Sequence, residues 1–168
     1  IDANVGSKLL FTAGMDFTHP VTLSTSTVFE SNAPVSIPAA ISGGAALTTG
    51  GSGAITLSGS NTHTGTIQAN GNLNIDGSIA ANSNAVTVSS GAKLGGSGTI
   101  SRPVNVSGSI APGNGIGTLS IPSTLTFQGG SSYVFDIGAW TGAAGTGYDT
   151  LAVSNLSITS SPASKFTV

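Results

Sequence analysis

The chain has 168 residues, enough for one domain with a hydrophobic core, but only 6% of them are charged and 25 are glycine. A hydrophobic share of 38% together with so little charge excludes a disordered chain. Four basic residues at a net charge of −2 offer no basic surface to nucleic acid or to an anionic membrane, and the absence of cysteine excludes a disulfide scaffold and a thiolate metal site.

The sequence also lacks targeting segments that can be recognised by their composition. No run of about 18 apolar residues predicts a transmembrane helix. No basic start followed by an apolar stretch predicts a signal peptide. Because the chain begins at Ile1 rather than at methionine and stops in a strand-like stretch at Val168, we expect it to be a piece of a longer polypeptide.

Short stretches in which apolar and polar residues alternate predict β-strands along the chain, and no window has the period of an amphipathic helix. Residues 1–40 have only the general texture of such strands, with 21–37 fitting an early coil. Each later stretch runs into Gly, Ser or Asn. These predicted strands are residues 54–59, 72–77, 85–91, 104–108, 124–130, 133–138, 150–155 and 156–161.

A short imperfect repeat in the middle of the chain predicts how these strands are arranged. Ile79, Leu94 and Ile110 follow similar motifs and lie 15 and 16 residues apart. Such periods indicate a solenoid, in which each unit buries its apolar face on the next. We therefore expect an all-β parallel β-helix with aliphatic residues inside, hydroxyl residues outside, and Gly and Asn at the corners. Roughly 20 residues per coil would give about eight coils and a rod about 40 Å long.

An antiparallel β-sandwich is the alternative fold. The Asn70-Gly71 pair is typical of a two-residue hairpin turn. Residues 111–117 contain a second turn of similar composition. Paired in this way, neighbouring strands would run in opposite directions.

Residues 41–75 contain a spaced series of glycine, aliphatic and asparagine residues: Gly44, Leu47, Gly51, Gly53, Ile55, Leu57, Gly59, Asn61 and Gly65. This series resembles the passenger-associated repeat of bacterial autotransporters. His63 departs from the pattern, since the family usually has tyrosine there. The likeness extends to roughly 41–168, and Ala111 to Asn114 form its most recognisable later motif.

The resemblance implies a right-handed parallel β-helix outside a Gram-negative cell, secreted or held at its surface. It divides the chain into weakly matched coils at 1–40 and repeats at 41–168 that continue beyond the chain end. It also implies export by a C-terminal outer-membrane barrel, which this sequence does not contain. The function expected is a structural stalk or adhesin segment for attachment or cell–cell aggregation. A self-assembling filament subunit and a polysaccharide-active enzyme are the alternatives.

The sequence suggests no catalytic, cofactor-binding or metal-binding residue. Asp136 and Asp149 could pair as in a glycosidase, but the interpretation favoured here is an outward or edge strand position for Asp136 and a turn position for Asp149, and Lys93 and Arg102 are isolated. The glycine-rich 112–117 lacks the lysine and the helix of a phosphate-binding loop. Two histidines, His19 and His63, are too few and too far apart for a metal site.

Trp140 and Tyr148 are the candidate contact residues. Both belong to the Gly/Ala-rich segment 138–149. On a protruding loop, they could stack on a sugar or contact a protein. The partners would be host or bacterial surface molecules, or another copy of the chain, with no nucleic acid and no membrane insertion. Packing of this loop against the rod is the alternative.

Asn105 and Asn155 match the N-glycosylation pattern but are interpreted as strand residues.

Overall fold

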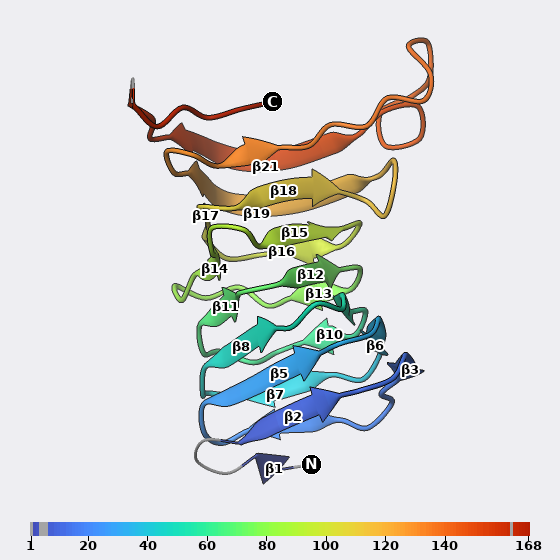
Figure 1. Ribbon diagram of the computed structural model, residues 1–168, viewed down its shortest axis with the longest axis vertical. Coiled ribbons are helices and arrows are strands. Elements are labelled where there is room, and N and C mark those ends of the chain that lie inside the picture. The colour runs from blue at the N-terminus through green and yellow to red at the C-terminus, as the bar shows by residue number, and fades with distance from the viewer. Residues whose placement is uncertain (1, 4–6, 162) are drawn as a thin grey trace.

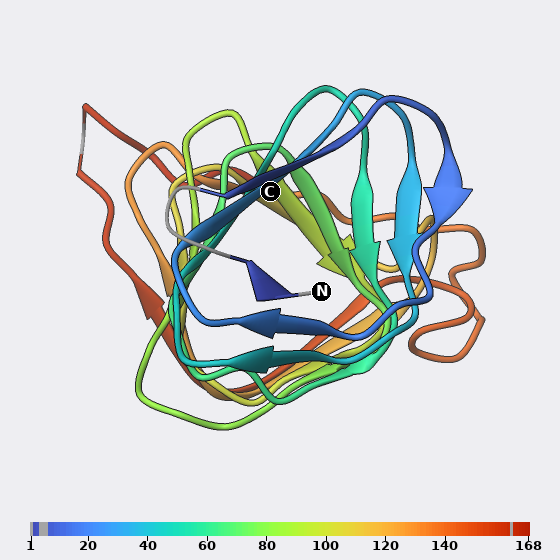
Figure 2. The same cartoon turned by 90° about the horizontal axis from the view of Figure 1, so that it is seen from below.

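The strands of this protein wind into a parallel β-helix, a rod whose coils rise in chain order (Figure 1). The structure is a computed structural model that describes residues 2–3, 7–161 and 163–168. Within these residues it is all β, with no helix. Seen along the rod, each early coil has three sides (Figure 2).

The three sides are here called the first, second and third face. The first face contains β1 (Asp2–Ala3), β4 (Val21–Leu23), β7 (Ile41–Gly43), β10 (Ser60–Asn61), β13 (Ser78–Ile79) and β16 (Thr99–Ile100). The second contains β2 (Lys8–Phe11), β5 (Thr27–Ser31), β8 (Leu47–Gly50), β11 (Ile67–Ala69), β14 (Val86–Val88) and β17 (Val104–Val106). The third contains β3 (Met15–Asp16), β6 (Val35–Ile37), β9 (Ile55–Leu57), β12 (Asn72–Ile75), β15 (Lys93–Gly96), β18 (Ser109–Pro112) and β20 (Ser132–Tyr133).

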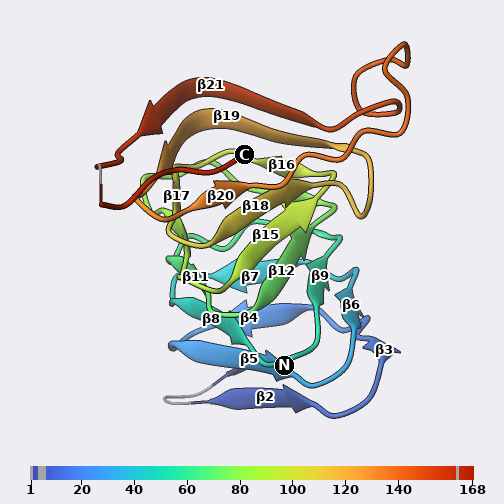
Figure 3. The ribbon, with the colours of Figure 1, turned by 45° about the horizontal axis from the view of Figure 1, so that its top comes forward.

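The first and second faces fuse at the C-terminal end of the rod. Strand β19 (Thr118–Phe127) pairs with β16 through its first half and with β17 through its second half. Strand β21 (Thr150–Ile158) then pairs with β19 along its length, so each of these long strands covers the width that two short strands cover below (Figure 3). The sequence predicts separate strands at 150–155 and 156–161, and this prediction is wrong because no corner divides the fused face.

Every ladder between strands is parallel in the described part of the chain, which confirms the predicted β-helix and rules out the antiparallel sandwich. Asn70-Gly71 is not a hairpin turn. It joins β11 on the second face to β12 on the third, and each of these strands pairs with strands of the coils below and above.

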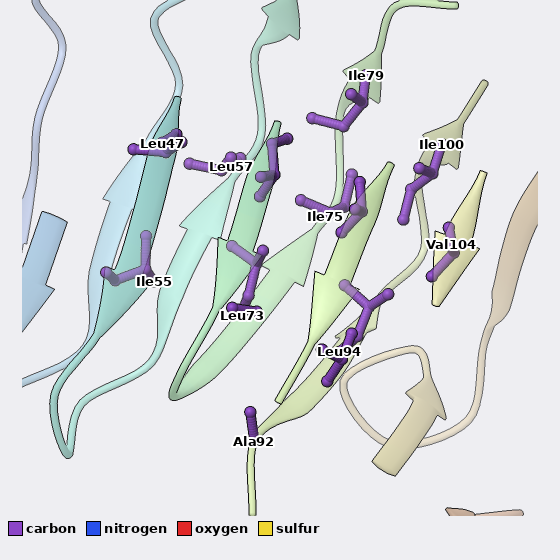
Figure 4. Close-up of a cluster of buried hydrophobic side chains, with 14 of the residues drawn as sticks. Leu47, Ile55, Leu57, Leu73, Ile75, Ile79, Ala92, Leu94, Ile100 and Val104 are labelled. Atoms are coloured by element: carbon purple, nitrogen blue, oxygen red, sulfur yellow. The ribbon is translucent and has the colours of Figure 1, made fainter. Parts of the chain in front are cut away.

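Apolar residues stack in columns inside the rod. On the third face, Ile55, Leu73, Leu94 and Ile110 follow one another in register, and all are buried. Figure 4 shows the first three of these side chains, from successive strands, within the core. Full burial of one such side chain stabilises a fold by about 1.5–3 kcal/mol. The alternating pattern of the sequence therefore becomes one continuous core.

The expected coil length of roughly 20 residues is confirmed over most of the rod, where Thr27 pairs with Leu47 and Leu47 with Ile67. The number of turns is about six rather than eight, and the last step is longer than the others, since Leu125 pairs with Leu156. The apparent repeat of 15 to 16 residues is only half right. Leu94 does stack on Ile110, but Ile79 lies on the first face and pairs with Ile100.

Glycine occupies corners that need a left-handed backbone. Gly96 has φ 101° and Gly91 has φ 80°. Asparagine also lies at corners, as Asn32 and Asn70 do, but the expected positive φ is wrong for it, since only glycine has a positive φ among the described residues. At Gly96 a second constraint applies, because a Cβ would lie 2.2 Å from the carbonyl oxygen of Ile75 in the coil below.

This difference predicts unequal costs for two alanine substitutions. Gly91→Ala should lower the free energy of unfolding by about 1–2 kcal/mol, the cost of the left-handed backbone alone, since its Cβ would meet nothing within 4 Å. Gly96→Ala should cost about 3 kcal/mol or more, because the coils must also move apart. Urea unfolding of both variants measures the difference, and equal losses would show that coil contact at Gly96 is not limiting.

Candidate functional site

Residues 134–149 leave the rod as a loop between β20 and β21 (Figures 1 and 3). The sequence predicts a strand at 133–138, but only Tyr133 of that stretch is in one. Tyr133 pairs with Ile110 and Val134 donates to the carbonyl of Ile110 at 2.8 Å, but the pairing ends there although β18 continues to Pro112. Phe135 and Ile137, which alternate with polar residues as core residues of a strand do, are therefore exposed outside the core.

The loop is held in shape by its own backbone. Gly138 and Ala139 donate N–H bonds to the carbonyl of Gly147, at 2.8 and 2.9 Å. Gly145 donates to the carbonyl of Tyr148 at 2.8 Å, and Ile137 forms an antiparallel bridge with Tyr148. A segment fixed in this way loses less conformational entropy on binding than a free loop would.

Asp149 anchors the loop to the rod. Its side chain is buried, and its two carboxylate oxygens accept N–H bonds from Gly117 at 2.9 Å and from Asp136 at 3.0 Å. Gly117 belongs to the corner of residues 113–117, which joins β18 to β19. The carboxylate of Asp149 is thus occupied by backbone groups, while the side chain of Asp136 is exposed. This arrangement supports the interpretation of Asp149 as a turn residue.

The structure brings Trp140 and Tyr148 together, with two residues that sequence reasoning missed. Phe135, Ile137, Trp140 and Tyr148 line a cavity of about 300 Å³, here called the aromatic loop site. Trp140 is 86% exposed, so the loop does not bury it against the rod. The rings of Phe135 and Tyr148 lie 6.2 Å apart, centroid to centroid.

A larger apolar cavity of about 520 Å³ adjoins this site at the end of the rod. Phe135 and Tyr148 line both cavities, and the other walls include Phe127, Phe166 and the inward side chains of β21. Tyr133 also lines it, and burial followed by the charge of Asp149 raises the pKa of its phenol to about 12. Tyr133 is therefore neutral at physiological pH, and the wall it contributes carries no charge.

The other sequence candidates lie apart from this loop. His19 is exposed beside Phe17, whereas His63 is buried in the corner between β10 and β11. In the described part of the chain, no three residues of metal-binding type gather, and no helix is long and apolar enough to cross a membrane. Asn105 and Asn155 lie in β17 and β21, as interpreted.

Arg102 is the residue that sequence analysis missed most clearly. It is fully buried, and its guanidinium donates hydrogen bonds to three backbone carbonyls of two other coils, those of His63, Gly65 and Ala80. The sequence could have drawn attention to this residue by its rarity, because Arg102 is the one arginine in a sequence with four basic residues.

The anchor role of Asp149 predicts a clear contrast between two substitutions. Asp149→Asn replaces one acceptor oxygen by a donor that faces a backbone N–H, and should lower the free energy of unfolding by about 1.5–3 kcal/mol. Asp136→Asn, at an exposed carboxylate, should change it by less than about 0.5 kcal/mol. Urea unfolding measures the stability, and amide exchange of residues 134–149 shows whether the loop loosens. Equal stability of the two variants would contradict the anchor.

Comparison with known proteins gives one relative and no assigned family. A protein named "Extracellular serine protease" from Serratia marcescens is 42% identical over 99 residues. The match covers 58% of this chain but only 9% of that protein, so the chain corresponds to a small part of its relative. No family model matches the sequence. No solved structure matches it. The similarity to an extracellular protein fits a secreted or surface location.

Proposed function

We propose that this chain is a rod segment of an extracellular bacterial surface protein, a stalk or adhesin of the autotransporter passenger type, and that it makes contacts through the aromatic loop site. The segment itself catalyses no reaction. Three findings support the proposal: the parallel β-helix, the sparse charge, and the similarity to an extracellular protein over 58% of the chain. The function of the rod would thus be to hold the aromatic loop site away from the cell, where a partner can bind it.

The exposure of Trp140 carries the contact proposal. An indole that is 86% exposed, above a cavity lined by Phe135, Ile137 and Tyr148, leaves apolar surface in water. Exposed apolar patches mark interaction sites, and tryptophan and tyrosine are enriched among residues that dominate binding energies. The fixed backbone of the loop adds to this, because the site exists before a partner arrives.

The charge of the loop limits the classes of partner that it can bind. Residues 134–149 contain no lysine, arginine or histidine, and their exposed carboxylate is that of Asp136. An anionic partner would gain no counter-charge here. The partner that fits is a neutral molecule of a host or bacterial surface, or another copy of the chain.

Removal of the aromatic side chain provides the test. In cells that display the full chain, Trp140→Ala should reduce adhesion to epithelial monolayers, or settling by cell–cell aggregation, about tenfold, the effect of losing a dominant contact. Tyr148→Ala should have a similar effect. Met15→Ala is the matched control, because Met15 is a large apolar residue, 47% exposed, on another part of the rod.

Surface display of each variant must be equal, which antibody labelling measures. Adhesion and settling that are unchanged in Trp140→Ala would refute the aromatic loop site as the contact. Hydrolysis of polysaccharides by the purified chain would refute the proposal that it is not an enzyme.

A further inference from the structure

One corner of the rod contains a buried positive charge without a carboxylate partner. The corner between the first and second faces is built from residues 44–46, 62–66, 80–85 and 101–103, here called the arginine corner. Arg102 donates from Nε to the Ala80 carbonyl at 3.1 Å, from Nη1 to that of Gly65 at 2.8 Å and from Nη2 to that of His63 at 2.5 Å. These bonds join the coil of Arg102 to the two coils below it.

Backbone carbonyls alone compensate this charge. The ion pair of the described residues is that of Lys8 and Glu30, which belongs to β2 and β5. A buried guanidinium held by carbonyl dipoles has acceptors for its hydrogen bonds, but no negative charge cancels its own. Any second positive charge placed nearby would be repelled with little screening.

His63 is the residue that can supply such a charge. Its side chain is 1% exposed, its Nε2 has no hydrogen-bond partner, and its own carbonyl accepts a bond from Arg102. The segments that form the arginine corner contain no other titratable or charged residue. The same holds for the strands that flank it, β7, β8, β10, β11, β13, β14, β16 and β17.

We propose that the arginine corner is an acid-sensitive joint, in which protonation of His63 beside the buried Arg102 opens the corner while the three faces stay stacked. The backbone N–H groups of Thr62, His63 and Thr64, which donate to Ile41 and Gly43 in the coil below, are the bonds released. The inference does not depend on the function proposed above, since it concerns a different part of the rod.

The direction of the pH effect follows from the lowered pKa of His63. Burial, and then the charge of Arg102, lower the pKa of His63 from 6.5 to about 4, although the backbones of Ala45 and Thr66 partly oppose this. The opened form therefore binds the proton more tightly than the closed form. The closed corner keeps its full stability above about pH 6.5 and loses it as the pH falls toward 4.

Amide hydrogen exchange of the full chain at several pH values tests the joint. After correction for the intrinsic exchange rate, the opening equilibrium at Thr62, His63 and Thr64 should rise about tenfold or more between pH 7 and pH 4. The amide of Asn70, which donates to Thr49 at a different corner, should not change and is the internal control.

Two substitutions assign the effect to His63. His63→Tyr and His63→Phe both remove the titrating group and should abolish the rise at these amides, and two aromatic replacements guard against one that folds poorly. His19→Asn, at the exposed histidine, should leave the rise intact. Opening that is independent of pH in the natural chain, or a rise that persists in His63→Tyr, would overturn the proposal. A rise that appears equally at Asn70 would also overturn it, because the whole rod would then be unfolding.

Discussion

The parallel stacking of coils at the spacing of hydrogen-bonded strands, about 4.8 Å, constrains every other feature of this protein. Each inward side chain rests on one of the coil below, as Leu73 does on Ile55. A polar group at such a position has protein above and below it and no water, so aliphatic residues dominate the interior. Glycine occupies the closest approaches, such as Gly65, where a Cβ would lie 2.0 Å from the carbonyl oxygen of Ala45.

The same stacking explains why charge is scarce on the outside. Outward residues of successive coils also follow in register, as Thr48, Gln68, Thr87 and Asn105 do on the second face. Like charges so placed would repel at every step, whereas hydroxyl and amide groups can bond to one another. The amide of Gln68 donates to the hydroxyl of Ser89 at 2.7 Å. A polar but nearly uncharged surface is thus a consequence of the fold.

The aromatic loop site and Arg102 lie where the chain departs from the regular stacking of coils. The loop 134–149 begins where the pairing with β18 ends, and it turns Phe135 and Ile137 outward to meet Trp140 and Tyr148. Arg102 lies in the last corner before the first and second faces fuse in β19. There a long side chain with five N–H donors reaches the carbonyls of two coils, which an aliphatic residue cannot do. The contact site and the pH response that we propose therefore lie at separate irregularities of one regular rod.

The sequence by itself determined the all-β class, because alternation and turn residues are local signals that survive without coordinates. Its imperfect repeats and its resemblance to a known repeat favoured the parallel β-helix over the antiparallel sandwich. It also placed Trp140 and Tyr148 on a loop, since the Gly/Ala-rich segment around them fits no strand. Only the tertiary structure decided which faces the strands belong to, that Phe135 and Ile137 leave the core, and that Arg102 lies beside His63. The physical reason is that such pairings depend on the length of each coil. Residues 39 positions apart meet only because the intervening coils and corners bring them to the same side of the rod.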